Sequence, residues 1–241
     1  MKIAIISDVH GNYEALSAVL ADLAGRPYDL LISLGDNIGY GPEPEQVLVR
    51  MQMMNILSVA GNHERAMFDS QAYDGLNFQA QENNLRTRAM LSPESLLYCQ
   101  AMPDFWVQDR AYFVHGFPPD SFSRYLYEVP DEEIREYLAG TGMDVCFVGH
   151  THRPALLEVE DGQLITTKLG EGHFVLDPCR SYIVNVGSVG QPRGKDRRAQ
   201  YVLWDSLSHE LQVICLSYDP LPTMKKIRAL GFSENYASRL Q

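Results

Sequence analysis

Short apolar runs alternate with amphipathic segments along the first third of the chain. The runs Ile3–Ile6, Leu30–Leu34 and Ile56–Val59 have the length of buried strands. Between them, apolar residues recur at helical spacing from residue 13 to about residue 24, and a second helix is expected to begin near Pro44. We therefore predict the order β-α-β-α-β, which implies a parallel sheet with right-handed crossovers.

The pattern changes after residue 64. The stretch 65–102 is polar, and its spacing predicts helices at Asn77–Leu91 and Pro93–Gln100. We expect these helices to form an insert that acts as a cap beside the site, because insertions of this kind often build lids or specificity walls. Two further buried strands, Tyr112–Val114 and Val145–Val148, flank another predicted helix at Asp131–Ala139.

After residue 152 the chain consists mainly of strands joined by short turns. We expect these strands to form an antiparallel sheet that packs beside the first, followed by a helix at Thr223–Leu230 that ends at Gly231. The chain has no internal repeat or linker, so the predicted fold class is α/β (α+β): one domain over residues 1–241, with two sheets in a sandwich flanked by helices. The expected late strands are Ala155–Glu158, Gln163–Thr167, Phe174–Leu176, Tyr182–Asn185, Ala199–Asp205 and Leu211–Ser217.

Five of the predicted buried strands are followed by short blocks of Asp, Asn, His and Gly. Ligands of α/β sheets bind outside the carboxyl ends of the strands, so these blocks are expected to meet at one place. Histidine, carboxylate and amide oxygen without cysteine suit a hydrolytic divalent metal better than a structural zinc. The blocks are Asp8-Val9-His10, Gly35-Asp36-Asn37, Gly61-Asn62-His63-Glu64, His115-Gly116 and Gly149-His150-Thr151-His152.

The number of candidate ligands favours two metal ions. Asp8 and His10 are two residues apart, as are His150 and His152, so in extended backbone both members of each pair point the same way. Asp36 offers two oxygens and could bridge a pair of cations. About seven ligands are too many for one tetrahedral ion and suit two ions that share a carboxylate. The seven are Asp8, His10, Asp36, Asn62, His115, His150 and His152.

Composition excludes several other classes of protein. The chain has 241 residues and a net charge of −11, which argues against non-specific binding to nucleic acid backbones. Four cysteines without C-x-x-C spacing do not suggest a disulfide framework and fit a reducing cytoplasm. The apolar run after Lys2 is too short for a signal peptide, and no run has the length of a membrane-spanning helix.

Together the five blocks resemble the metallophosphoesterase superfamily with the calcineurin-like fold, whose pattern is D-x-H, G-D, G-N-H-[DE], H and G-H-x-H. All five are present in order between residues 8 and 152, and Asn185–Arg193 is similar to a block of small prokaryotic members. The resemblance implies that His63 protonates the leaving group with support from Glu64. It assigns one metal to Asp8, His10, Asp36 and His152, and the second to Asp36, Asn62, His115 and His150.

The resemblance also implies an activity. Two cations about 3.5–4 Å apart would lower the pKa of a bridging water and orient a phosphate for hydrolysis. The small prokaryotic relatives suggest small phosphodiesters or nucleotide phosphoanhydrides as substrates, as in diadenosine polyphosphate hydrolases. The ligand types permit manganese, iron, zinc, nickel or cobalt, and manganese is favoured. The residues leave the natural substrate and the oligomeric state open.

Two other functions remain as alternatives. Protein Ser/Thr phosphatases of this superfamily carry G-D-x-x-D-R-G, whereas Gly35–Gly41 has Tyr40 in place of the arginine, which argues against that activity. A non-catalytic metal-binding scaffold would be expected to lose ligands or the G-N-H histidine, yet all are present here. Arg193, in a basic segment that ends at Arg198, could supply the missing phosphate-binding cation; a solvated turn is the other interpretation.

Overall fold

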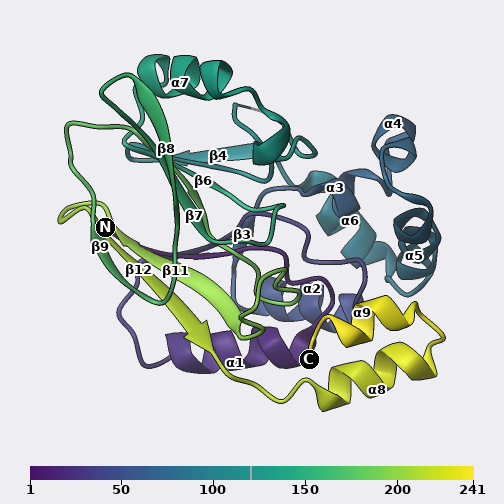
Figure 1. Ribbon diagram of the computed structural model, residues 1–241. Coiled ribbons are helices and arrows are strands. Elements are labelled where there is room, and N and C mark those ends of the chain that lie inside the picture. Colours follow the sequence, from purple (N-terminus) through teal and green to yellow (C-terminus); the bar gives the residue numbers. More distant parts are fainter. Residues whose placement is uncertain (120) are drawn as a thin grey trace.

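A computed structural model, which describes residues 1–119 and 121–241, contains two six-stranded sheets packed face to face (Figure 1). Sheet A consists, in spatial order, of β3 (Leu57–Ser58), β2 (Leu30–Ser33), β1 (Lys2–Ile6), β11 (Ala199–Asp205), β12 (Glu210–Leu216) and β9 (Gly172–Val175). Sheet B consists of β4 (Phe105–Gln108), β5 (Ala111–Val114), β6 (Val145–Val148), β10 (Tyr182–Asn185), β7 (Ala155–Glu160) and β8 (Gln163–Lys168).

Alternating side chains of the central strands build two separate cores. Ile3 and Ile5 of β1 pack between the sheets with Phe113 and Phe147, whose rings lie 5.4 Å apart. The intervening residues Ala4 and Ile6 face the other way, against helix α1 (Tyr13–Leu23). Helix α2 (Pro44–Met53) joins α1 on that face, and α7 (Asp131–Gly140) covers the outer face of sheet B (Figure 1). The molecule therefore has four layers, with helices outside both sheets.

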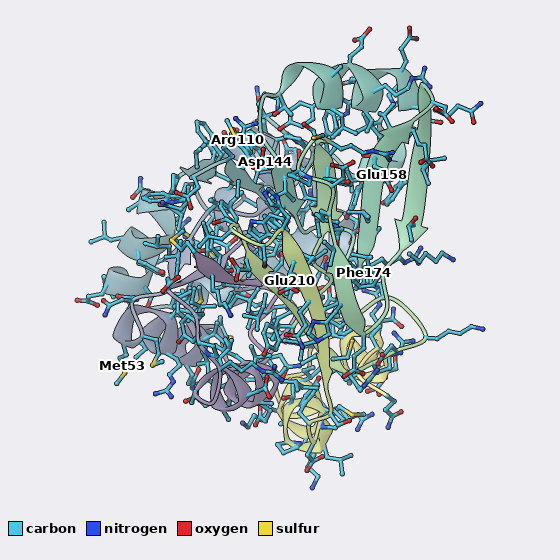
Figure 2. All side chains as sticks on the ribbon, turned by 90° about the vertical axis from the view of Figure 1, so that its left-hand side faces the viewer. Met53, Arg110, Asp144, Glu158, Phe174 and Glu210 are labelled. Atoms are coloured by element: carbon cyan, nitrogen blue, oxygen red, sulfur yellow. The ribbon has the colours of Figure 1, made fainter. Side chains whose placement is uncertain are left out.

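Each sheet contains one parallel group of strands. In sheet A, β1 pairs with β2 and β2 with β3, which confirms the expected β-α-β-α-β order. In sheet B, β6 is parallel to both β5 and β10. The carboxyl ends of each group consequently share one edge of their sheet. At the opposite end of β5 and β6, Arg110 forms an ion pair with Asp144, and both are labelled in Figure 2.

The late strands do not form a sheet of their own, and the prediction of a separate antiparallel sheet is wrong. Strand β11 pairs with β1, so that Ile3 lies opposite Trp204, and β12 and β9 extend sheet A beyond it. Strands β10, β7 and β8 complete sheet B. All four residues of β10 are buried, and a strand buried on both faces is most stable with a neighbour on each side.

The insert is helical, as expected, and lies to one side of the sandwich (Figure 1). Helices α5 (Phe78–Ala89) and α6 (Pro93–Ala101) confirm the two predicted helices, whereas the short α3 (Asn62–Arg65) and α4 (Ser70–Asp74) were not predicted. Ala80 of α5 shares an apolar cluster with Met224 of α8 (Leu221–Ala229) and Tyr236 of α9 (Glu234–Ser238). The insert is thus packed against the C-terminal helices.

The cysteines and the helices agree with two expectations from composition. Cys99, Cys146, Cys179 and Cys215 are all free thiols, so the described residues contain no disulfide. Among the described helices, none combines the length and apolar character that crossing a membrane requires.

Candidate metal centre

The predicted ligands converge where the parallel strands of the two sheets end. Asp8 follows β1, Asp36 follows β2, and Asn62 begins α3 just beyond β3, all from sheet A. His115 directly follows β5, and His150 follows β6 after Gly149, both from sheet B. Every predicted ligand is buried, the most exposed being Asn62 at 8%. The site therefore lies between the two sheets, and each sheet supplies part of it.

The backbone at these ligands is not extended, which corrects the reason given above for their convergence. Asp8 and His10 have φ values of 54° and 49°, and His150 and His152 have values of 64° and 56°. Asp36 is also left-handed, with φ of 52°. Such backbone is uncommon for residues other than glycine, although Asp, Asn and His tolerate it best. Strain of this kind is characteristic of functional sites that the surrounding fold holds in place.

Glycines allow the loops to approach one another. A Cβ atom at Gly61 would overlap Asp36, and one at Gly149 would overlap Ser7 and come within 2.8 Å of Asp8 Oδ2. Neither position can therefore carry a side chain while the two aspartates keep their places. The glycines of these blocks therefore permit close packing around the ligands.

One set of donor atoms gathers around Asp8, His10 and His152. His152 Nε2 lies 3.1 Å from Asp8 Oδ1 and 3.2 Å from His10 Nε2. Asp36 Oδ2 is 3.8 Å from His10 Nε2. Four residues from both sheets can therefore direct one donor atom each toward a common point.

A second set gathers around Asp36, His115 and His150. His115 Nε2 lies 3.2 Å from Asp36 Oδ2, 3.1 Å from His150 Nδ1 and 3.2 Å from Asn62 Oδ1. The same oxygen of Asp36 thus borders both sets. This arrangement fits a carboxylate shared between two cations.

Backbone carbonyls fix the tautomer of each histidine in these sets. A carbonyl can only accept a hydrogen bond, so the ring nitrogen that contacts it must carry the hydrogen. The opposite ring nitrogen then directs its lone pair to the centre, as in metal ligands oriented by an outer partner. The pairs are His10 Nδ1 with Ile38 O (3.0 Å), His115 Nδ1 with Leu34 O (2.7 Å), His150 Nε2 with Ser123 O (2.9 Å) and His152 Nδ1 with Gln191 O (2.6 Å).

The donor atoms are better placed to bind two cations than to hydrogen-bond with one another. The facing nitrogens of His10 and His152 have no hydrogen to share if both rings are neutral, and the same holds for His115 and His150. Asp8 Oδ1 is buried and has no hydrogen-bond partner among the described residues. Lone pairs held 3.1–3.2 Å apart in a buried site repel unless positive charge lies between them. The residues present are therefore suited to divalent ions.

The pKa values follow from burial and from the two carboxylates. Burial lowers the pKa of His150 to about 3 and that of His152 to about 4, so both rings are neutral and available as ligands at pH 7. Burial also acts to lower the pKa of His115, but Asp36 and Asp8 outweigh it and raise the value to about 9. Burial opposes ionisation of Asp36, yet the nearby histidines hold its pKa below the usual range. Asp36 is therefore the negative centre of the site.

His63 lies beside the donor sets with a free ring nitrogen. Its backbone N–H donates to Asp36 Oδ1 (2.9 Å), and its carbonyl accepts from Asn84 Nδ2 of the insert (2.9 Å). Its Nδ1 is buried without a hydrogen-bond partner in the described part of the chain. Burial lowers the pKa of His63 to about 3, assisted by His10 and His115 and opposed by Asp36. The ring is thus neutral in the protein alone.

Glu64 supports His63 indirectly. Its carboxylate accepts hydrogen bonds from the backbone N–H groups of Gly61 (2.9 Å), Asp36 (2.9 Å) and Asn37 (2.8 Å). These bonds join the loop after β2 to the start of α3, so Glu64 sets the position of Asp36 relative to His63. The Glu64 side chain therefore acts by holding the two loops together.

Aromatic rings surround the donor sets. Tyr40 is buried, and its ring centre lies 4.5 Å from the rings of both His10 and His63, so it packs as part of the loop. Tyr125 lies flat on His150, with ring centres 3.7 Å apart and an angle of 15°. Sequence reasoning missed Tyr125, because it lies in an irregular segment far from any of the motif blocks.

The basic segment divides into two kinds of side chain. Arg198 forms ion pairs with Asp196 and Glu171 (both 2.7 Å). Arg193 has no ion pair with any carboxylate in residues 1–119 and 121–241, and its buried Nε has no partner there. Burial acts against its charge, but the phenols of Tyr40 and Tyr125 outweigh this and raise the pKa of Arg193. Arg193 therefore lies at the site as a cation without a neutralising acid.

Comparison with known proteins agrees with this geometry. Residues 1–154 match the family described as calcineurin-like phosphoesterase. An uncharacterised protein of Methanocaldococcus jannaschii is 32% identical over 231 residues, which cover 93% of this chain and 91% of that protein. Serine/threonine-protein phosphatase 2 of Escherichia coli is 46% identical over 61 residues, 25% of this chain and 28% of the phosphatase.

Solved structures extend the likeness over the whole chain. A metallophosphoesterase from Sphaerobacter thermophilus has a TM-score of 0.82 and 32% identity, and covers 100% of this chain and 98% of its own. A protein of Pyrococcus horikoshii shares the fold with a TM-score of 0.79 at 18% identity, covering 99% and 97% of the two chains. Residues 1–154, which match the family, contain all five motif blocks. The chain therefore belongs to the calcineurin-like phosphoesterase family.

Proposed function

We propose that this protein is a two-metal phosphoesterase that hydrolyses small phosphodiesters or nucleotide phosphoanhydrides. The observation that carries the proposal is the pair of buried donor sets that border the same oxygen of Asp36. Of the metals that such ligands accept, manganese is favoured over iron, zinc, nickel and cobalt. When bound, two such ions would lower the pKa of a water molecule and neutralise charge on the phosphate oxygens.

The chain's own residues divide the work. Asp8, His10 and His152 would hold one ion and Asn62, His115 and His150 the other, with Asp36 common to both. The backbone carbonyls behind the four histidines keep the lone pairs directed inward, so little reorganisation is needed on binding. Burial of all these groups strengthens their attraction for cations and for a phosphate.

His63 is proposed as the residue that delivers a proton to the leaving oxygen. Its ring lies beside the donor sets, and its Nδ1 is buried without a hydrogen-bond partner among the described residues. The bond that its N–H donates to Asp36 and the bond that its carbonyl accepts from Asn84 fix its backbone. A neutral imidazole still carries one N–H and can donate it as a hydrogen bond. A bound phosphate adds negative charge next to the ring, which favours protonation of His63.

Arg193 is proposed to bind the substrate phosphate. Its backbone N–H donates to the carbonyl of His152 (3.3 Å), and its side chain lacks a carboxylate partner among the described residues. Because a hydrogen bond to a charged group contributes more than a neutral one, Arg193→Met should raise KM for bis-p-nitrophenyl phosphate by about tenfold or more. Steady-state kinetics would measure this, with Lys195→Met, an exposed cation of the same segment, as the matched control. Equal KM values in both variants would contradict the assignment.

The proposed function is tested by turnover of bis-p-nitrophenyl phosphate with the protein loaded in turn with manganese, nickel, cobalt, iron, zinc and magnesium. We expect the highest rate with manganese and none after chelation, with activity restored when the metal is returned. The same preparations should then be given cyclic nucleotides and dinucleoside polyphosphates. Absence of turnover with every metal and substrate would reject the proposal.

Protein phosphatase activity is a second candidate, since a 61-residue segment is similar to serine/threonine-protein phosphatase 2. Tyr40 occupies the place of the arginine expected there, and its ring is packed between His10 and His63. We therefore expect a phosphopeptide to be hydrolysed more slowly than a nucleotide substrate. A metal-binding scaffold without activity would instead show fewer than two ions per chain in metal analysis, together with no turnover.

Three further predictions accompany this function. Residues 65–102 are proposed to act as a cap within a single domain, because Asn83 Oδ1 accepts from the N–H of Tyr40 and Asn84 contacts His63. The partner is expected to be a small phosphate ester rather than nucleic acid or a membrane. The cytoplasmic location suggested by the cysteines stays a prediction.

A further inference from the structure

Three aromatic rings are stacked in a row that leads from the metal centre to the surface. Tyr125 lies on His150 with ring centres 3.7 Å apart, and Tyr127 lies on Tyr125 with centres 4.8 Å apart. The interplanar angle is 15° at both steps. The row therefore begins on a candidate metal ligand and continues outward in nearly parallel planes.

The last ring of the row is held in place but open to solvent. Tyr127 is 72% exposed. It belongs to the 3-10 turn η1 (Leu126–Glu128), and the nearby residues Leu126 and Val129 anchor this turn by packing into the core outside sheet B. The Glu128 carboxylate also accepts a hydrogen bond from the N–H of Tyr125. A fixed aromatic ring with an open face is suited to stack against another flat ring.

Positive charge lies beside the same row. Arg153 donates from Nε to the carbonyl of Arg193 (3.1 Å), which brings the two arginine residues together. Burial raises the pKa of the Tyr127 hydroxyl, and the charges of Arg193 and Arg153 act on it in the opposite direction. Because the backbone N–H of Arg193 also donates to the carbonyl of His152 (3.3 Å), this pair of arginines adjoins the first donor set.

We propose that Tyr127 is the base-binding residue of the site and that the substrate is a nucleotide, with its base stacked on Tyr127 and its phosphate at the donor sets. In a nucleotide, a ribose separates the base from the phosphate. The proposed site has a corresponding separation, because Tyr125 lies between Tyr127, which would bind the base, and His150, which belongs to the donor sets that would bind the phosphate. A sugar phosphate or a phosphopeptide lacking an aromatic ring would leave the face of Tyr127 unused. This inference rests on the proposed function and narrows it from phosphate esters in general to nucleotides.

The test compares two ligands that differ only by the base. Isothermal titration calorimetry on the manganese-loaded protein would measure the affinities of AMP and ribose 5-phosphate, with product analysis to check that both remain intact. We expect AMP to bind at least about fivefold more tightly, the effect of one stacked base. Tyr127→Ala should bring the ratio close to one, whereas Tyr127→Phe should keep it because the ring remains.

A matched control is available on the insert. Phe78 is 80% exposed, and Phe78→Ala should leave the AMP preference of the wild-type protein intact. Thermal denaturation of each variant would verify that it is folded. Because the rings of Tyr127 and Phe78 are both exposed, we expect the fold to tolerate their substitution. Equal affinities for the two ligands, no binding of either, or an AMP preference that survives Tyr127→Ala would each overturn the proposal.

Turnover of bis-p-nitrophenyl phosphate by the same preparations separates this proposal from the proposed function. Turnover without a preference for AMP would reject the role of Tyr127 alone. A Tyr127-dependent preference for AMP without turnover of any substrate would reject the hydrolase and retain the nucleotide site.

Discussion

His63→Ala is expected to lower kcat for bis-p-nitrophenyl phosphate by about 10²–10⁴-fold, the range of general acid catalysis, while both metal ions stay bound. The reason lies in the geometry: the His63 ring lies beside the donor sets and its buried Nδ1 has no partner among the described residues, whereas the donor sets can be completed by the other residues. The measurement combines steady-state kinetics with metal analysis by mass spectrometry on the same samples.

His173→Ala is the matched control for this change. His173 is exposed on β9, so this substitution removes the same kind of side chain at a position away from the site. It should leave both kcat and metal content unchanged. A ring nitrogen of His63 lies within 4.8 Å of donor atoms of His10 and Asp36, so His63 could itself bind metal. Loss of metal together with activity in His63→Ala would show that His63 is a ligand instead. An unchanged kcat would remove it from the mechanism altogether.

Asp36→Asn is expected to have the widest effect of any single substitution, because this side chain borders both donor sets. Loss of an outer partner of a metal ligand typically costs about 10–100-fold in affinity or activity, so loss of the shared ligand's charge should cost more than about 100-fold. Asn retains the oxygen that accepts from the N–H of His63, so the loop itself should survive.

Metal-dependent stabilisation gives a second measurement for Asp36. Ions that bind only the folded wild-type protein at about 100 times Kd should stabilise it by about 2.7 kcal/mol, which corresponds to a Tm rise of about 5–10 °C. Asp36→Asn should abolish most of this rise, while Asp161→Asn, in the turn between β7 and β8, should keep it. A full manganese-dependent rise in Asp36→Asn would refute the shared position.

The candidate site could be predicted from sequence because its residues lie in short blocks after strands. Asp8, Asp36 and His150 each follow a run of apolar residues, and the carboxyl ends of parallel strands share an edge. Spacing alone does not explain the convergence of Asp8 and His10, because they converge through left-handed backbone rather than an extended strand. Backbone of this kind depends on the loops packed around it and leaves no periodic signal.

Strand partners were harder to predict than strands. The limits of β10 and β11 follow from their apolar residues, but their neighbours in the sheets depend on contacts with β1 and β6, which are distant in sequence. Strand β4 was not predicted, because its three apolar residues are consecutive and do not alternate with polar ones. All three are exposed at the edge of sheet B. The stack of Tyr125 on His150 likewise joins segments that no local pattern relates.

The origin of the ligands in both sheets has a consequence for unfolding. His10 and His152 are 142 residues apart, and Asn62 and His115 are 53 residues apart, yet each pair would be tied to one ion. Each ion would then act as a reversible cross-link that closes a long loop of the unfolded chain. Chelation should therefore lower the free energy of unfolding of the sandwich as a whole, because residues of both sheets lose the ions that would tie them together.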